Sequence, residues 1–314
     1  MALSIEQIAA VSYEAVLAEM RKPENQWAEN AAMREFQRQG MLERVAYGPT
    51  LEVPLDYRAN PDTAILATDQ DAAPLLKTEV ITAASYSIAQ LNVPVTWTKG
   101  DDAKNPAENQ KVDFVKAILE NGINSHDDLC EQSIFTTSAA GGDELLGLDT
   151  LVPDSGQGTV GGIDASTEAW WQNFADTYTD ETDIEAAMTE AWNTAAKGTG
   201  SALSPKLLIS GAEAQALFES TQQALQRYVD KNEADAGFKV LAFKSSRYVF
   251  SQYGDDHIYF LNPKSYKMTV SKQYFRDKGT TEVVPGQNAF YFLIYSALQN
   301  VITNKSRLAV LSQA

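Results

Sequence analysis

The chain has 314 residues, 44% of them hydrophobic, and a formal net charge of −17 at pH 7. That length and apolar content allow a substantial core, divided between two domains. Such an acidic surface repels nucleic-acid phosphate and anionic membranes, which argues against simple electrostatic binding of DNA. The single cysteine, Cys130, excludes an intrachain disulfide and a cysteine-based zinc cluster and fits a reducing cytosol.

The sequence shows no pattern of a targeting or membrane-spanning segment. Its first residues, MALSIEQIAAV, lack the basic start and the long apolar stretch of a signal peptide. No window approaches the run of about 20 apolar residues that spans a bilayer. A secreted β-rich binding protein is therefore disfavoured.

The N-terminal segment predicts two helices. Residues 3–21 form an amphipathic pattern with Ser4 as the N-cap. Residues 24–39 form a second helical pattern that ends at Gly40. Together the two helices would make an N-terminal arm.

The most unusual stretch is residues 78–98, which read as almost unbroken strand. At about 3.3 Å per residue this run reaches roughly 70 Å, whereas a compact chain of this length has a radius of gyration of about 20 Å. Residues 51–58 alternate apolar and polar side chains and predict the outgoing strand of the same hairpin, with residues 69–74 near its tip. The pattern indicates a ribbon that projects from the body and lies on another molecule.

Two features describe this hairpin further. Apolar side chains occupy even positions up to Ile88 and odd positions from Leu91 onward, which predicts a β-bulge near residues 89–92. Each arm also contains a proline, Pro54 and Pro94. Proline cannot donate to a strand ladder, so we expect both positions at an edge or a bulge.

The rest of the chain alternates helix and strand patterns. A long helix is predicted from Pro106 to about residue 132, with a buried stripe of Val112, Val115, Ile118, Leu119 and Ile123. Further helices are predicted over residues 180–197 and 211–231. Strands are predicted over residues 206–210 and in four runs after residue 238, KVLAF, YVFS, HIYFL and YKMTV. Residues 288–301 are ambiguous between helix and strand, and their aromatics favour strand for at least the first half.

The glycine-rich segment contains a literal GxGxxG match over residues 156–161. A dinucleotide fingerprint needs a strand directly before it and a helix directly after it. Here Pro153 interrupts the approach, and Gly162 and Asp164 prolong the loop. We therefore expect a flexible surface loop, with a nucleotide-dependent enzyme as the alternative.

The remaining candidate groups have structural alternatives of their own. Two groups combine histidine with carboxylates, His126-Asp127-Asp128 and Asp255-Asp256-His257. Adjacent side chains on a helix point apart, so no metal site is predicted at His126. The second group is predicted to form a turn. Cys130 has His126 four residues earlier as a possible base, yet a buried structural cysteine is the favoured interpretation. Trp170-Trp171 is predicted to be a core or interface anchor rather than a stacking platform. Catalysis by carboxylates alone stays open.

The order of elements resembles the major capsid proteins of tailed double-stranded DNA phages, the Hong Kong 97 type. Three local segments carry the resemblance: residues 159–173 (TVGGIDASTEAWWQN), 257–262 (HIYFLN) and 288–308 (NAFYFLIYSALQNVITNKSRL). It implies an α+β fold with an N-terminal arm (1–48), an E-loop β hairpin (49–104), a peripheral domain with a long spine helix (105–135 and 257–290) and an axial domain (136–256 and 291–314).

The resemblance also implies a function. Hexamers and pentamers would form an icosahedral shell that encloses DNA without sequence-specific binding, with the E-loop lying over a neighbouring subunit. No catalytic, cofactor or metal residue is expected, and assembly would occur in the bacterial cytoplasm with separate scaffolding, portal and decoration proteins. The acidic charge would keep the packaged DNA from sticking to the wall. An encapsulin-like shell around protein cargo is the closest alternative.

Some members of the family join a lysine to an asparagine covalently. Lys77, Asn300 and Asn304 lie in the regions concerned, but no motif in this sequence maps the reaction. Some members also begin with a cleaved scaffolding domain. Because the first predicted helix begins almost at Met1, we expect a separate scaffold or a mature chain.

Overall fold

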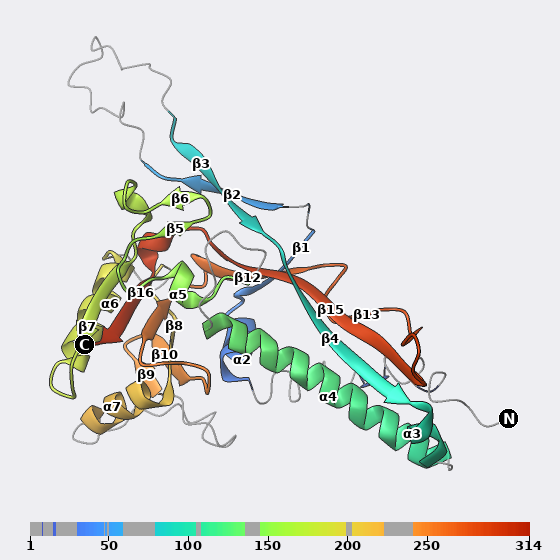
Figure 1. Ribbon diagram of the computed structural model, residues 1–314. Coiled ribbons are helices and arrows are strands. Elements are labelled where there is room, and N and C mark those ends of the chain that lie inside the picture. Colours follow the sequence, from blue (N-terminus) through green and yellow to red (C-terminus); the bar gives the residue numbers. More distant parts are fainter. Residues whose placement is uncertain are drawn as a thin grey trace, which may run out of the picture.

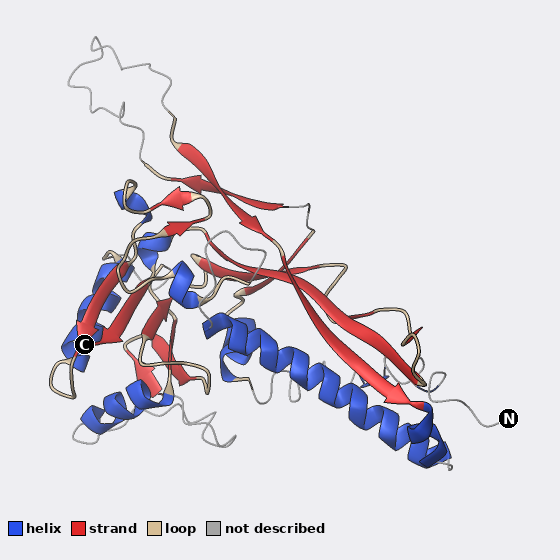
Figure 2. Ribbon diagram, in the orientation of Figure 1, coloured by secondary structure: helices blue, strands red, loops and turns tan. Residues whose placement is uncertain are grey.

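The computed structural model describes residues 8, 15–16, 30–46, 48, 50–58, 79–104, 108–135, 145–198, 203–222 and 241–314. Two six-stranded sheets and two two-stranded sheets combine with helices in this part of the chain, which confirms the α+β class. Each large sheet belongs to one lobe, and the hairpin lies at the edge of the molecule (Figures 1 and 2).

The first lobe is elongated and is built around one long strand, β15 (Ala289–Ile302). Its sheet has the order β1-β12-β15-β13, with β4 and β14 also paired to β15. A 28-residue helix, α4 (Glu108–Phe135), runs along the β4–β15 ribbon (Figure 1). The other elements of this lobe are β1 (Leu42–Val45), β4 (Ala89–Thr98), α3 (Lys99–Lys104), β12 (Tyr266–Ser271), β13 (Asp277–Lys278) and β14 (Glu282–Val283).

Helix α4 packs closely on this ribbon because it has a glycine at the contact. A Cβ at Gly122 would lie 2.8 Å from a methyl of Val95. Val115, Leu119 and Ile123 of the predicted stripe are buried, and Ile118 is half-buried. Val112 was expected in the stripe but is 40% exposed.

The exposure of Val112 follows from the length of the strand beneath it. Val112 lies ten residues before Gly122, about 15 Å along the helix. Only three residues of β4 follow Val95, about 10 Å of strand. The helix start therefore extends past the end of the strand, and no described strand covers Val112.

The second lobe has a sheet of order β7-β16-β11-β8-β10-β9. Helices α6 (Ile184–Ala196) and α7 (Ala212–Gln222) pack against this sheet and form a second apolar core with it. Its strands are β7 (Phe174–Tyr178), β8 (Leu207–Ser210), β9 (Leu241–Phe243), β10 (Ser246–Phe250), β11 (Ile258–Leu261) and β16 (Ala309–Gln313).

Short elements join the two lobes. Helix α2 (Ala31–Arg38) contacts both α4 and β10. The glycine-rich segment folds into a small hairpin of β5 (Thr159–Val160) and β6 (Ile163–Asp164). The remaining short helices are α5 (Leu148–Leu151), η1 (Ala169–Trp171) and η2 (Lys305–Arg307).

The long strand run divides between two sheets at Ile88. Strand β3 (Ile81–Ser87) pairs with β2 (Thr50–Asp56), whereas β4 pairs with β15. Burial falls on Ala84 and Tyr86 before Ile88, and on odd positions from Ala89 onward. The predicted phase change is confirmed, but it marks an exchange of partner strand rather than a bulge within one ladder.

Pro54 and Pro94 both lie at the kind of position that was expected. Pro54 is in a two-stranded sheet, and Pro94 is in β4, whose only partner among the described strands is β15. Residues 288–301 were ambiguous between helix and strand, with strand favoured for at least the first half; they form strand from Ala289 onward in β15.

Three strands lie outside the domain boundaries that the sequence led us to expect. β11 was placed in the peripheral domain (257–290), but it pairs with β8 and β16 in the second lobe. β15 extends through residues assigned to the axial domain (291–314), and β4 through residues assigned to the E-loop (49–104), yet both lie in the first lobe. The strand runs were recognised correctly, but their partners are distant in sequence.

Several predicted helices fall only partly within the described residues. Of residues 3–21, Ile8, Ala15 and Val16 are described and helical. The second predicted helix is seen as α2, and the helix predicted over 211–231 is seen as α7 up to Gln222. The predicted hairpin tip, residues 69–74, and Lys77 lie outside the described residues.

Candidate assembly elements and a buried polar cluster

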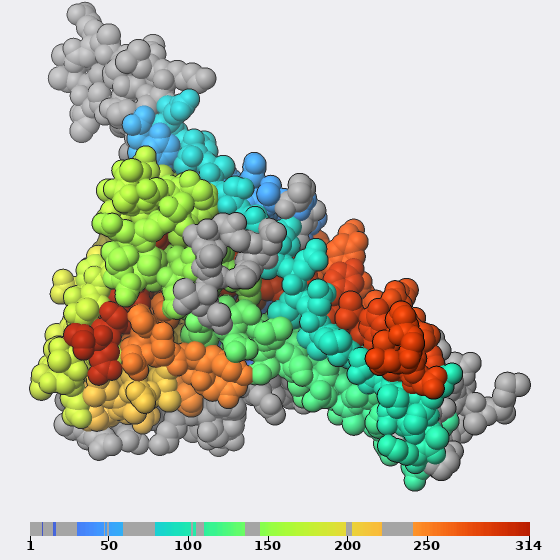
Figure 3. Space-filling view, in the orientation of Figure 1, coloured from blue at the N-terminus to red at the C-terminus, as the bar shows by residue number. Residues whose placement is uncertain are grey.

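The β2–β3 hairpin leaves the body beside the β5–β6 hairpin (Figure 1). Its register runs from Thr50 opposite Ser87 to Asp56 opposite Ile81. The pairing continues one residue further, where Tyr57 N–H donates to the Val80 carbonyl at 3.1 Å. In the space-filling view the blue and cyan surface of the hairpin lies against the yellow-green surface of the residues near 160 (Figure 3).

The two faces of this hairpin differ in polarity. The inner face is apolar and buried or half-buried, and consists of Leu51, Val53, Leu55, Ala84 and Tyr86. The outer face mixes acidic and apolar side chains, namely Glu52, Pro54, Asp56, Ile81 and Ala83. Ile81 is 67% exposed. The outer face is therefore exposed and partly apolar.

Three consecutive residues of β3 bond to the body of the protein. Ser85 N–H donates to the Gly161 carbonyl at 3.0 Å. The Tyr86 hydroxyl donates to the Ile302 carbonyl at 3.0 Å and accepts from the Ile302 N–H at 3.3 Å. The Gln299 amide donates to the Ser87 carbonyl at 2.6 Å. We call these contacts the hairpin anchor.

A second exposed surface lies on the β4–β15 ribbon. Leu293 is opposite Pro94, and Tyr295 is opposite Asn92. Tyr274 contacts Tyr295 with a ring-centroid separation of 5.4 Å, and Tyr274 and Leu293 are 44% and 37% exposed. Together these side chains present an aromatic and aliphatic surface.

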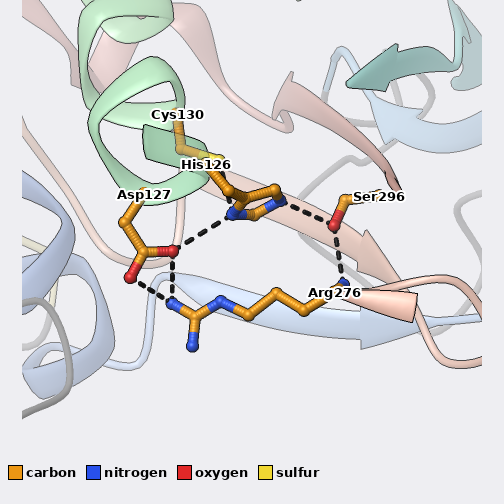
Figure 4. Close-up of polar contacts among 5 residues, drawn as sticks. All are labelled: His126, Asp127, Cys130, Arg276 and Ser296. Atoms are coloured by element: carbon orange, nitrogen blue, oxygen red, sulfur yellow. Dashed lines mark hydrogen bonds and ion pairs between the residues drawn. The ribbon is translucent and has the colours of Figure 1, made fainter. Parts of the chain in front are cut away.

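A buried polar cluster joins α4 to β15 (Figure 4). His126 Nε2 lies 2.8 Å from Ser296 Oγ, and His126 Nδ1 lies 3.1 Å from Asp127 Oδ1. The Arg276 guanidinium donates to both Asp127 oxygens at 2.5 Å, and its backbone N–H donates to Ser296 Oγ at 2.7 Å. The expectation that His126 and Asp127 point apart is wrong, because the Asp127 carboxylate lies within hydrogen-bond distance of His126 Nδ1.

This cluster has the connectivity of a serine–histidine–aspartate triad, which the sequence did not predict because Ser296 is 170 residues from His126. Its side chains are fully enclosed: His126 and Ser296 have no exposed surface, and Arg276 is 3% exposed. Burial lowers the pKa of His126, although the Asp127 carboxylate opposes that shift. A substrate cannot reach the serine in this arrangement, so the cluster binds α4 to the sheet.

Cys130 belongs to the same region, with its Sγ 3.9 Å from His126 Nδ1. The thiol is fully buried, as predicted for a structural cysteine, and burial raises its pKa well above the ordinary range. A thiol that stays protonated is a poor nucleophile. The described residues contain no group of three metal-ligating side chains.

The other motifs that the sequence singled out form parts of the folded structure. Residues 156–161 run into the turn of β5–β6 and are followed by β6, not by a helix. Trp171 is buried and donates to the Val160 carbonyl at 3.1 Å, as predicted for a core anchor. The pair Asp255-Asp256, expected in a turn, lies in the loop just after a turn at Gln252-Tyr253, with a bend at Asp256. The Asp255 carboxylate lies 2.9 Å from the His257 ring and raises the pKa of His257. Asn300 is buried and donates to the Leu146 carbonyl.

Buried carboxylates connect α2, α4 and β10. Glu131 of α4 accepts from the Ser251 hydroxyl at 2.5 Å, and burial raises its pKa. Glu35 of α2 accepts from Arg247 at 3.1 Å. These contacts tie the two lobes to the arm.

Among the described helices none is long and apolar enough to cross a membrane.

No protein-family model and no curated protein matches this chain. Solved structures do match along most of its length. The capsid asymmetric unit of cyanophage A-1(L) has a TM-score of 0.59 at 15% identity, covering 88% of this chain and 92% of that one. The capsid of a native GTA particle has a TM-score of 0.62 at 10% identity, covering 89% of each chain.

An encapsulin has the same fold. The holo-SrpI encapsulin complex of Synechococcus elongatus PCC 7942 matches with a TM-score of 0.53 at 9% identity, covering 86% of this chain and 84% of that one. The chain therefore has the Hong Kong 97-like fold that its sequence resembles.

Proposed function

We propose that this chain is the major capsid subunit of a tailed phage and assembles into the icosahedral shell that encloses double-stranded DNA. The observation that carries the proposal is a match to capsid subunits over 88% of the chain, in a molecule whose β2–β3 hairpin lies at its edge. The inner face of this hairpin packs on the body, whereas its outer face includes Ile81, which is 67% exposed. A neighbouring subunit against the outer face would cover it.

The domain division follows the sheets. The first lobe, with α4, β4 and β15, is the peripheral domain, and the second lobe is the axial domain. Residues 50–58 and 79–88 form the described part of the E-loop. Hexamers and pentamers form when the hairpin of one subunit lies over the peripheral domain of the next. The exposed Tyr274 and Leu293 on the β4–β15 ribbon give that neighbour an apolar surface.

The role is structural rather than catalytic. The chain's lone cysteine and the Ser296–His126–Asp127 arrangement are enclosed, which leaves them without access to a substrate. Like charges on the subunit and on the packaged DNA repel each other, so DNA is enclosed without sequence-specific binding. Scaffolding, portal and decoration proteins act as separate partners, and assembly takes place in the bacterial cytoplasm.

A second candidate is an encapsulin-like shell, which the match to the SrpI complex favours. The two functions share a fold and differ in contents. The contents of the particles distinguish the two functions. The particles should be purified from cells that express this chain together with its neighbouring genes. Encapsidated double-stranded DNA supports the phage capsid, and a stoichiometric protein cargo without DNA supports the encapsulin.

Electron microscopy of the purified chain, with and without its scaffold, tests assembly itself. We expect capsomers or shells of uniform diameter. Deleting residues 62–78 should leave a folded subunit that forms no shells, because the hairpin then no longer reaches its neighbour. Monomers under every condition from the full chain, or intact shells from the deletion variant, would contradict the proposal.

A further inference from the structure

The glycine-rich segment packs directly under the projecting hairpin. Gly161 has a φ of +62°, and a Cβ at this position would lie 2.6 Å from the Cβ of Ala84 and 3.2 Å from the ring of Tyr86. The next residue, Gly162, has a similar φ of +79°, but a Cβ there would meet nothing within 4 Å. Gly161 therefore meets two requirements, a left-handed backbone and the close approach of β3.

The close approach at Gly161 is part of the hairpin anchor. Its carbonyl accepts from Ser85 N–H on the side of β5–β6. One residue later, Tyr86 bonds to Ile302 of β15, and its side chain is 2% exposed. The hairpin is thus held from two directions by consecutive residues. A strand fixed at successive positions by separate elements has little freedom to tilt.

The direction of the hairpin matters because its far end lies well beyond the anchor. From Ser87 to Ile81 the strand extends roughly 20 Å. Simple geometry then moves the end of β3 by roughly 3–4 Å for a tilt of about 10° at the anchor, given that strand length. Closed shells need each contact to recur with a fixed rotation between subunits. An error of that size would displace the hairpin from its contact surface.

We propose that Gly161 and Tyr86 are positioning residues for assembly, which set the direction in which the hairpin leaves the body and hence where it meets the next subunit. This inference rests on the proposed capsid function. It also accounts for the GxGxxG match, whose last glycine is required by the contact with Ala84 rather than by a phosphate. Neither residue needs to touch the neighbouring subunit to act in this way.

The adjacent glycines provide a matched test. Gly161→Ala and Gly162→Ala both place a side chain on a left-handed backbone, but only the first meets Ala84. The double variant Gly161→Ala with Ala84→Gly removes the clashing methyl group. Distances between nitroxide spin labels on Asp56→Cys and Glu190→Cys, both exposed positions, report the direction of the hairpin in the unassembled subunit, because Asp56 lies opposite Ile81 at the far end of the hairpin. Cys130 is buried and stays in place.

We expect the mean distance to shift by several ångströms in Gly161→Ala, to stay unchanged in Gly162→Ala and to return in the double variant. Shell yield should fall at least tenfold in Gly161→Ala and recover with Ala84→Gly. An unchanged distance and normal shells in Gly161→Ala would overturn the inference. So would a loss of shells in Gly162→Ala equal to that in Gly161→Ala.

Tyr86→Phe tests the anchor without adding an atom, and it decides the matter if Gly161→Ala does not fold. Its control is Tyr178→Phe, since Tyr178 is also buried and donates to a backbone carbonyl, that of Asp256, in the other lobe. We expect a broader distance distribution and fewer closed shells in Tyr86→Phe alone. An unchanged distribution in Tyr86→Phe would overturn the inference.

The distances are measured on the unassembled subunit, so this result stands apart from the capsid proposal. If the wild-type chain forms no shells under any condition, the capsid function is contradicted, while the distances still decide whether Gly161 and Tyr86 direct the hairpin.

Discussion

Lys305 offers a quantitative test of the energetics of this fold. The side chain is fully buried at η2, which packs against α6 and η1. Its ammonium has no hydrogen-bond partner among the described residues. Burial without a partner disfavours the charged form and lowers the pKa of Lys305 from 10.5 to about 8.

The pKa difference sets the size of the effect. One unit of pKa corresponds to about 1.4 kcal/mol, so at pH 7 the buried lysine costs about 3 kcal/mol relative to an exposed one. Methionine fills a similar volume without a charge. Lys305→Met should therefore raise the free energy of unfolding by about 2–3 kcal/mol at pH 7.

The advantage of Lys305→Met should depend on pH. The folded lysine releases its proton near pH 8, whereas the unfolded lysine keeps its proton until about pH 10.5. Between these values the unfolded state binds more protons, so wild-type stability rises with pH. The difference in the free energy of unfolding between Lys305→Met and wild type should therefore decrease by about 2 kcal/mol from pH 8 to pH 10.

Urea unfolding of the unassembled subunit at pH 7, 8, 9 and 10 measures both quantities. The control is Lys272→Met, at an exposed position, which should change stability by less than about 0.5 kcal/mol. A destabilised Lys305→Met variant at pH 7, or a difference that stays constant from pH 8 to pH 10, would refute the reasoning.

Three further predictions concern α4. Wild-type stability should fall as pH drops below 6.5, because burial keeps His126 neutral in the folded state while the unfolded histidine takes up a proton; urea midpoints at pH 5 and 6.5 should show a smaller decrease in His126→Gln. Asp127→Asn leaves a buried guanidinium without its carboxylate and should cost about 3–5 kcal/mol, measured by the same unfolding assay; equal midpoints would contradict the contact. Gly122→Ala gains about 1 kcal/mol of helix propensity but overlaps Val95, so a net loss of about 1–2 kcal/mol is expected from overpacking, relieved by Val95→Ala in the thermal midpoint; a more stable Gly122→Ala single variant would argue against close packing.

Much of the fold was predictable because the repeat of apolar side chains that marks a strand or a helix extends over only a few neighbouring residues. The alternation along β2, the phase change at Ile88 and the stripe of α4 follow from side-chain spacing within a few turns or strand residues. The resemblance of the element order then predicted the fold that the solved structures share.

The choice of strand partners was not predictable in the same way. The run HIYFL was recognised as a strand, yet its four residues in β11 are all buried and fit either sheet by pattern. Its placement beside β8 and β16 depends on contacts with residues about 50 positions away on either side. A strand pattern specifies which face is buried, but not which edge it meets.

The candidate site shows the same division. The sequence identified the hairpin, its edge prolines and the glycine-rich loop by local composition. Only the tertiary structure placed Gly161 against Ala84, Tyr86 against Ile302, and Ser296 beside His126. The spacing of apolar side chains repeats over a few residues and can therefore be recognised in the sequence. The contacts named above join segments 77 to 216 residues apart and form only when both lobes have packed.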